Sequence, residues 1–233
     1  MKDFRKYFLS KFPYSISTLD DRIKKMPFMN SLTRYVTKES IDSNMIQVDV
    51  FSELMSKRII YFGEEVSSES VNIAVSQLLY MKSVGNEPIH MYINTPGGEV
   101  YSGLALYDTM QLVQKSGIEL GTTVLGLAAS MGSILLVGGT TGKRSALEHS
   151  RILLHQVLSG TGPGSHQATD IEILSKETNI LKTELIQILA EKSGKTFDEV
   201  WDDCDRDHWL KATDALPGKY GPLGLVDQII TNF

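Results

Sequence analysis

Short apolar runs alternate with helical patterns through most of this 233-residue sequence, and the alternation limits the possible folds more than any other feature. Residues 57–63, 89–93 and 121–126 predict strands, because each run is short, apolar or β-branched, and ends at glycine or at turn residues. Helical patterns with apolar side chains three and four residues apart follow the first two runs. Such alternation predicts βαβ units, in which helices cover a largely parallel sheet. We therefore expect an α/β fold.

One helical pattern is unusually long. Apolar side chains recur at spacings of three and four between residues 166 and 193, and Gly194 then supplies a C-terminal stop. Helices of globular proteins are usually much shorter than this. We therefore expect this helix to project from the domain and to pack against another subunit.

Residues 1–44 differ from the rest of the chain, because their aromatic side chains are scattered without a sustained period. We interpret this segment as an N-terminal extension or propeptide-like arm whose aromatic groups find a surface to pack on. A regular pattern begins at Met45, and no linker-like stretch divides the sequence after it. Residues 45–233 therefore predict one domain.

The composition argues against several classes of function. A net charge of −5 provides no basic surface for neutralising phosphates, so nucleic acid is not an expected partner. No apolar run reaches the roughly 18–20 residues of a membrane span, and no signal peptide is recognisable, so no membrane association is expected. Cys204 is the single cysteine, which excludes an internal disulfide and fits a reducing, cytoplasmic location.

Ser130 is a candidate nucleophile. It lies in the run Ala-Ala-Ser-Met-Gly at residues 128–132, where small neighbours permit a sharp turn from a strand into a helix. At the start of a helix, backbone N–H groups can stabilise an oxyanion beside the hydroxyl. The same residues could instead form a simple helix cap, since short serine motifs are frequent.

A second turn, Asn-Thr-Pro-Gly-Gly at residues 94–98, follows the preceding strand. Its glycines permit close approach of a ligand to the backbone, although an ordinary βα turn can have the same composition. Consecutive parallel strands place their following turns at the same edge of a sheet. Gly98 and Met131 could therefore supply the two N–H groups of an oxyanion hole.

His155 ends an apolar strand, so it could reach the same edge as the general base for Ser130. A hydrogen-bonded structural histidine is the alternative. Asp207 belongs to the acidic stretch 202–207, and residue types alone do not select one carboxylate from that stretch. The histidines and Cys204 lack the spacing of a zinc site, so no metal is expected.

Six motifs in a fixed order resemble those of the ClpP peptidase family. They are residues 94–98, 128–132, 142–144, 150–156, 167–173 and 205–207. The resemblance implies a ClpP/crotonase-like α/β fold and a serine peptidase. In that family pattern Ser130 is the nucleophile, His155 is the base, Asp207 orients the base, and Gly98 and Met131 donate to the oxyanion. A triad is defined by geometry, so the chain order of its members is no obstacle.

The resemblance also implies an assembly of two stacked heptameric rings, a tetradecamer with internal active sites. The long helix would be the handle that joins the rings, and Arg206 would form an ion pair between them. An AAA+ Clp unfoldase would use ATP to deliver unfolded proteins for quality control, so the subunit itself would need no cofactor.

Two alternatives remain open. The chain could be a structural or regulatory paralogue that builds mixed rings and cleaves weakly. The loop between His155 and Gln167 is longer than usual for the family, and Val157 replaces its usual proline. The other alternative is a crotonase-fold enzyme that acts on an acyl-CoA thioester, but that chemistry does not need Ser130 together with His155.

Overall fold

The computed structural model describes residues 35–39, 45–160, 165 and 167–231, and the chain divides into two compact units, Met1–Leu54 and Met55–Phe233. In the first unit, strand β1 (Tyr35–Glu39) pairs antiparallel with β2 (Met45–Asp49), with Tyr35 opposite Asp49. Tyr35–Glu39 belongs to the segment predicted to be irregular, whereas the structure makes it a strand. Helix α4 (Val50–Ser56) follows directly, and the Asp49 carboxylate accepts a hydrogen bond from Ser52 N–H at its start.

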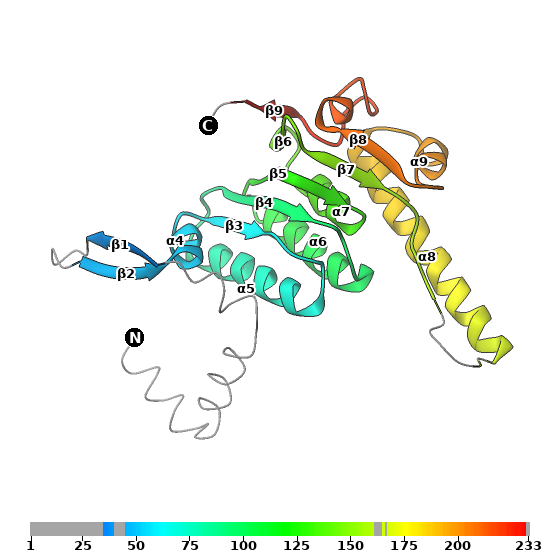
Figure 1. Cartoon of the computed structure of the whole chain (residues 1–233), viewed down its shortest axis with the longest axis horizontal. Coiled ribbons are helices and arrows are strands. Elements are labelled where there is room, and N and C mark those ends of the chain that lie inside the picture. The colour runs from blue at the N-terminus through cyan, green and yellow to red at the C-terminus, as the bar shows by residue number, and fades with distance from the viewer. Residues whose placement is uncertain (1–34, 40–44, 161–164, 166, 232–233) are drawn as a thin grey trace. The chain divides into compact units, whose positions relative to one another are not determined.

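The second unit is built on one sheet, which Figure 1 shows twisting across the molecule. Within the described residues it has seven strands, and five of them follow the order β3-β4-β5-β6-β9. Those five are β3 (Ile59–Phe62), β4 (Ile89–Thr95), β5 (Leu120–Ala129), β6 (Arg144–Leu147) and β9 (Gln228–Ile230). β7 (Arg151–Leu154) pairs with the far end of β5 and with β8 (His208–Lys211). All pairings in this sheet are parallel except β7–β8, which confirms the predicted α/β fold.

Helices pack along the sheet in chain order. They are α5 (Ser68–Val84), α6 (Val100–Lys115), α7 (Met131–Val137), α8 (Ala168–Ser193) and α9 (Phe197–Asp203), with a short 3-10 helix at Ala212–Ala215. Each α-helix from α5 to α9 contacts the next one in this series. The core between helices and sheet is apolar: Met91 and Ile93 of β4 and Leu106 and Met110 of α6 are fully buried. Burial of such side chains is the main favourable contribution to folding.

Helix α8 has two different halves. Its buried side chains all lie in the C-terminal half, whereas Ile171 and Ile173 near its start are 48% and 66% exposed. Figure 1 shows that the N-terminal half extends past the sheet. Gly194 ends the helix in the left-handed conformation with a φ of 73°, and its N–H donates to Ala190 O at 2.9 Å. The projecting helix and its glycine stop are therefore confirmed.

A buried arginine joins the end of the chain to the sheet. Arg144 on β6 is fully buried, and its guanidinium donates to both carboxylate oxygens of Asp227, at 2.6 and 3.1 Å. It also donates to the carbonyls of Lys192, Leu223 and Gly224. Because a buried charge is tolerated only when it is paired and fully hydrogen-bonded, this network fixes the end of α8 and the segment before β9 against β6.

Candidate active site

Ser130 lies at the sharp turn between β5 and α7. Its φ of 54° and ψ of −122° are strained for a residue with a side chain, and strain of this kind is typical of functional sites. Three hydrogen bonds hold the turn. Ser130 N–H donates to Leu153 O at 2.9 Å, and the Ser133 N–H and hydroxyl both donate to Ser130 O. The strand-to-helix turn that exposes a serine hydroxyl in this way is the arrangement of a nucleophile elbow.

The glycine turn after β4 packs directly against the Ser130 turn. Gly97 has a φ of +92°, and a Cβ built on it would lie 2.6 Å from both Ser130 Cβ and Ala129 O. Gly98 has a φ of +148°, and its Cβ would lie 2.2 Å from Val66 O. Only glycine fits either position without displacing the backbone. The two turns that the sequence places at one edge of the sheet are therefore in contact.

The two turns carry the backbone N–H groups of Gly98 and Met131, the candidate oxyanion donors. Val66 forms an isolated parallel bridge with Gly98, in which Val66 N–H donates to Gly97 O and Glu99 N–H donates to Val66 O. That bridge does not use the N–H of Gly98 itself. Met131 is the first residue of α7, and the first N–H groups of a helix have no partner within it.

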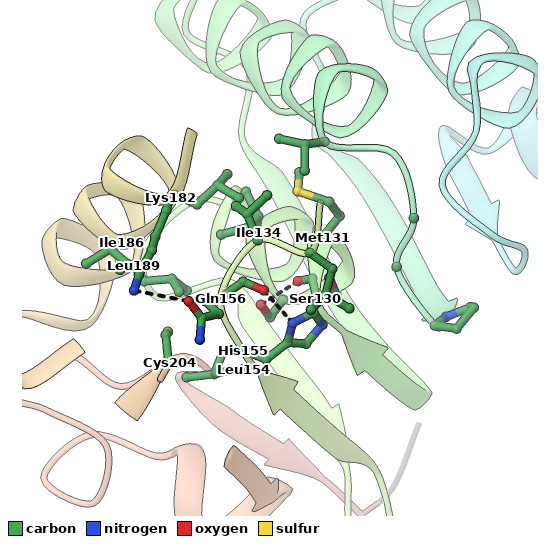
Figure 2. Close-up of a pocket in the computed structure, with 18 of the residues that line it drawn as sticks. Ser130, Met131, Ile134, Leu154, His155, Gln156, Lys182, Ile186, Leu189 and Cys204 are labelled. Atoms are coloured by element: carbon green, nitrogen blue, oxygen red, sulfur yellow. Dashed lines mark hydrogen bonds between the residues drawn. The ribbon is translucent and has the colours of Figure 1, made fainter. Parts of the chain in front are cut away.

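A cavity of about 270 Å³ opens beside Ser130. Gly98, Ser130, Met131 and His155 line it, and Figure 2 shows Ser130 and His155 with the other lining side chains. Apolar side chains from three elements also line it: Ile134, Leu154, Leu185, Ile186 and Leu189. The cavity thus combines an apolar wall with a few polar groups, which is usual for a ligand site.

His155 follows β7 directly and is partly buried. Its Nδ1 donates to the Gln156 carbonyl at 2.6 Å, since a carbonyl oxygen can only accept. In the neutral ring this bond leaves Nε2 as the unprotonated nitrogen, which is the tautomer that a base needs. Within the described part of the chain, no hydrogen bond joins His155 to Ser130 or to Asp207.

Asp207 and Arg206 lie outside this cavity. Both line a shallow surface hollow with Asp202, Asp203, Asp205 and His208. The Arg206 side chain is 83% exposed and pairs only with its neighbour Asp205, among the residues described. Of the five residues assigned to catalysis in the sequence analysis, the structure therefore brings four to one cavity and leaves Asp207 in a hollow next to it.

Although Asp207 lines a different hollow, the pairing of β7 with β8 brings its backbone near that of His155. Leu154 is opposite His208 in the last pair of this antiparallel ladder, and His155 and Asp207 are the residues directly beyond that pair. Their backbones therefore lie near each other at the end of the ladder.

The polar contacts of Gln156, the residue after His155, were not predicted from the sequence. Lys182 of α8 is only 9% exposed, and its Nζ donates to Gln156 Oε1 at 3.2 Å (Figure 2). The same Nζ lies 3.7 Å from the centre of the Trp201 ring, which is a cation-π contact. The sequence did contain a signal for this contact. Lys182 lies beside the apolar side chains Leu181 and Leu185 of the helix, and a lysine in such a place needs a polar or aromatic partner.

Cys204 also lines the cavity, and its thiol is buried. Burial raises the pKa of this thiol to about 12, with a smaller contribution from the charge of Asp203. The thiol is therefore protonated at neutral pH and is not a nucleophile there. Among the described residues, no group of three or more His, Cys, Asp and Glu side chains is arranged to hold a metal ion.

No helix in the described part of the chain is long and apolar enough to cross a membrane.

Comparison with known proteins identifies the family. The family model described as "Clp protease" matches residues 42–233. An "ATP-dependent Clp protease proteolytic subunit" from Bacteroides fragilis is 43% identical over 231 residues, covering 99% of each chain. The protein of that name from Porphyromonas gingivalis is 39% identical and covers 99% of this chain and 98% of its own. "ATP-dependent Clp protease proteolytic subunit 1" from Salinibacter ruber is 47% identical over 183 residues, 78% of this chain and 74% of its own. The chain therefore belongs to the Clp protease family and is a protease of the ClpP type.

Proposed function

We propose that this protein is the proteolytic subunit of an ATP-dependent Clp protease, which hydrolyses peptide bonds of unfolded polypeptides through an acyl-enzyme on Ser130. The contact between the Gly97 turn and Ser130 is the observation that carries the proposal. The lining of the neighbouring cavity supports it further, since the strained Ser130 lines this cavity together with Gly98, Met131 and His155. Acyl transfer requires these three components: a nucleophile, a base and an oxyanion site.

In the proposed mechanism the Ser130 hydroxyl attacks the scissile carbonyl carbon while Nε2 of His155 takes its proton. The carbonyl oxygen becomes an oxyanion that accepts hydrogen bonds from the N–H groups of Gly98 and Met131. His155 then returns the proton to the leaving amine, and water releases the acyl group by the same route. Each donated N–H of this kind stabilises the transition state by about 3–4 kcal/mol.

We assign to Asp207 the role of orienting His155 and stabilising its charged form. The support is the β7–β8 pairing, because its last pair is Leu154 and His208, and His155 and Asp207 are the residues directly beyond that pair. In the form described here, the Gln156 carbonyl accepts the Nδ1–H bond instead. A catalytic form therefore requires His155 Nδ1 to exchange this carbonyl for the Asp207 carboxylate. The required change is local, because the backbone segments that carry the two residues are already neighbours.

The relatives' names support the wider proposal, since each is called an ATP-dependent protease subunit. We propose that an AAA+ Clp unfoldase consumes the ATP, that this subunit needs no cofactor, and that both act in the cytoplasm. Two stacked heptameric rings would form the chamber, joined through the exposed half of α8 and through Arg206, whose side chain is 83% exposed. Residues 1–44 would form an accessory arm on the peptidase domain.

A catalytically weak paralogue in mixed rings is not favoured. Relatives that match nearly the full length of the chain are named as proteolytic subunits, and all five assigned catalytic residues are present.

Hydrolysis of a short fluorogenic peptide tests the proposal. The purified protein should cleave the peptide without ATP, because a short peptide needs no unfolding. Ser130→Ala should lower the rate to background and leave the particle size in light scattering unchanged, since only a hydroxyl is lost. Cleavage by the alanine variant at the wild-type rate would refute the proposal.

A further inference from the structure

The side chain of Gln156 joins two elements that flank the candidate base. Its Nε2 donates to Asp205 O at 2.7 Å, and its Oε1 accepts from Lys182 Nζ at 3.2 Å. The amide therefore spans from α8 to the acidic segment before β8. Both ends of the amide are used, so its orientation is fixed by its partners.

The anchor on α8 is rigid. Lys182 is nearly buried, and its ammonium group is held between Gln156 and the face of the Trp201 ring. Trp201 belongs to α9, the helix that leads into the acidic segment. A charge held by a hydrogen bond and an aromatic face in a desolvated site has little freedom to move.

The other end of the amide bonds a short segment that leads into β8, in which Cys204 is buried and donates its N–H to Val200 O at 2.9 Å. Residues 204–207 lie between α9 and β8 and belong to neither element. Asp205 N–H donates to Asp202 O at 3.2 Å, and the exposed Arg206 side chain bonds the Asp205 carbonyl. The Gln156 amide therefore adds a side-chain contact between this segment and the residue after His155, beside the β7–β8 pairing that begins at His208.

We propose that Gln156 is a positioning residue for the triad: its amide holds the Asp205 backbone so that Asp207 stays within reach of His155. The inference rests on the proposed function, because it assumes that Asp207 acts on His155. While the His155 Nδ1 bond moves from the Gln156 carbonyl to the Asp207 carboxylate, the side-chain amide keeps the acidic segment in place. Through Lys182, the same amide links the position of Asp207 to helix α8.

Gln156→Glu is the sharpest variant for testing this role. A carboxylate keeps the size of the side chain and still accepts from Lys182, but it cannot donate to the Asp205 carbonyl and repels it. We expect kcat for a fluorogenic peptide to fall at least about tenfold while KM changes less than about twofold, because orientation of the base matters in the transition state. Gln187→Glu is the matched control: Gln187 is exposed on α8 and bonds only Glu191 among the described residues, so its kcat should remain unchanged.

A double-mutant cycle with Asp207→Asn separates positioning from a general structural role. If Gln156 acts through Asp207, Gln156→Glu should lower the residual kcat of Asp207→Asn by less than about twofold. Lys182→Met removes the hydrogen bond from Lys182 to the Gln156 amide. It should lower kcat in the wild-type background and have little effect on the kcat of Asp207→Asn. This second variant decides the question if Gln156→Glu does not fold, as judged by thermal unfolding.

The outcomes distinguish this inference from the proposed function. The positioning role is wrong if folded Gln156→Glu keeps the wild-type kcat. It is also wrong if Gln156→Glu lowers the kcat of Asp207→Asn by the same factor as it lowers that of the wild type. In either case the assignment of the triad stands. An Asp207→Asn variant as active as the wild type overturns the assignment of Asp207, and the inference falls with it.

Discussion

Leu154 and His208 are opposite each other where β7 and β8 pair, and the ladder ends one residue before His155 would meet Asp207. His155 Nδ1 donates to the Gln156 carbonyl at this point. His155 and Asp207, the proposed base and its orienting acid, thus lie near each other at the end of the strand pair. They share no hydrogen bond in this form. The register accounts for how residues separated by 49 positions, such as Gln156 and Asp205, come into contact here.

Asp207→Asn should lower kcat by about 10³–10⁴-fold, because an amide can stabilise neither the required tautomer nor the charged ring of His155. The measurement is steady-state hydrolysis of a fluorogenic peptide. Asp205→Asn is the control, since the Asp205 carboxylate pairs only with the exposed Arg206 within the described residues. Its rate should stay within about twofold of the wild type. Equal losses of kcat in the two variants would show that the total negative charge of the segment matters, and not the Asp207 carboxylate itself.

Gly97→Ala should lower kcat by about 100-fold or more, because the new Cβ would displace the Ser130 turn by roughly an ångström. Peptide hydrolysis and thermal unfolding should be measured together. Gly117→Ala is the control: Gly117 has a φ of +88°, close to that of Gly97, but a Cβ there meets no atom within 4 Å. The control carries the same backbone strain without the clash. A similar loss of activity in both variants would contradict the account of the turn.

Arg144→Met should destabilise the protein by about 3–5 kcal/mol, because it removes the charge that pairs with the Asp227 carboxylate and leaves three carbonyls without their guanidinium donor; only the backbone N–H of residue 144 still donates to Asp227. The check is chemical or thermal unfolding of the assembled protein. Lys143→Met is the control at the next residue, where the ammonium pairs with Glu119 at an exposed site. Its effect should be below about 1 kcal/mol. A small effect of Arg144→Met would mean that the buried network contributes little to stability.

Cys204 should resist alkylation in the native protein at pH 8, because burial raises the pKa of its thiol to about 12 and keeps it from reagents. Mass spectrometry after iodoacetamide treatment should show no adduct until denaturant is added. The same shift lowers stability at high pH. The unfolded thiol ionises near its ordinary value of 9.0, so stability present below that pH is lost as the pH rises towards about 12. Rapid native alkylation at pH 8 would contradict the burial of this side chain.

The sequence was sufficient for the parts of the site that depend on local patterns. The strand at residues 89–93, the turn at 94–98 and the turn at Ser130 were all predicted, because each follows from short-range periodicity and small residues. Their meeting at one edge follows from parallel pairing alone, and the contact between Gly97 and Ser130 confirms it.

The parts that were not predicted depend on distant partners. The strand Tyr35–Glu39 exists through its pairing with β2, which no local pattern announced. Similarly, the contacts of Gln156 with Lys182 and Asp205 join three segments that are far apart in the sequence and meet only in the folded chain. Residues 1–34 and most of the long loop after Ser159 lie outside the described residues.

Fluorophosphonate labelling with mapping of the adduct shows whether Ser130 is the activated nucleophile. We expect one adduct per chain on Ser130, none in Ser130→Ala, and slower labelling in His155→Ala, because the base is lost. An adduct on Ser133 or on another serine, or labelling of Ser130 at the same rate without His155, would contradict this role of Ser130.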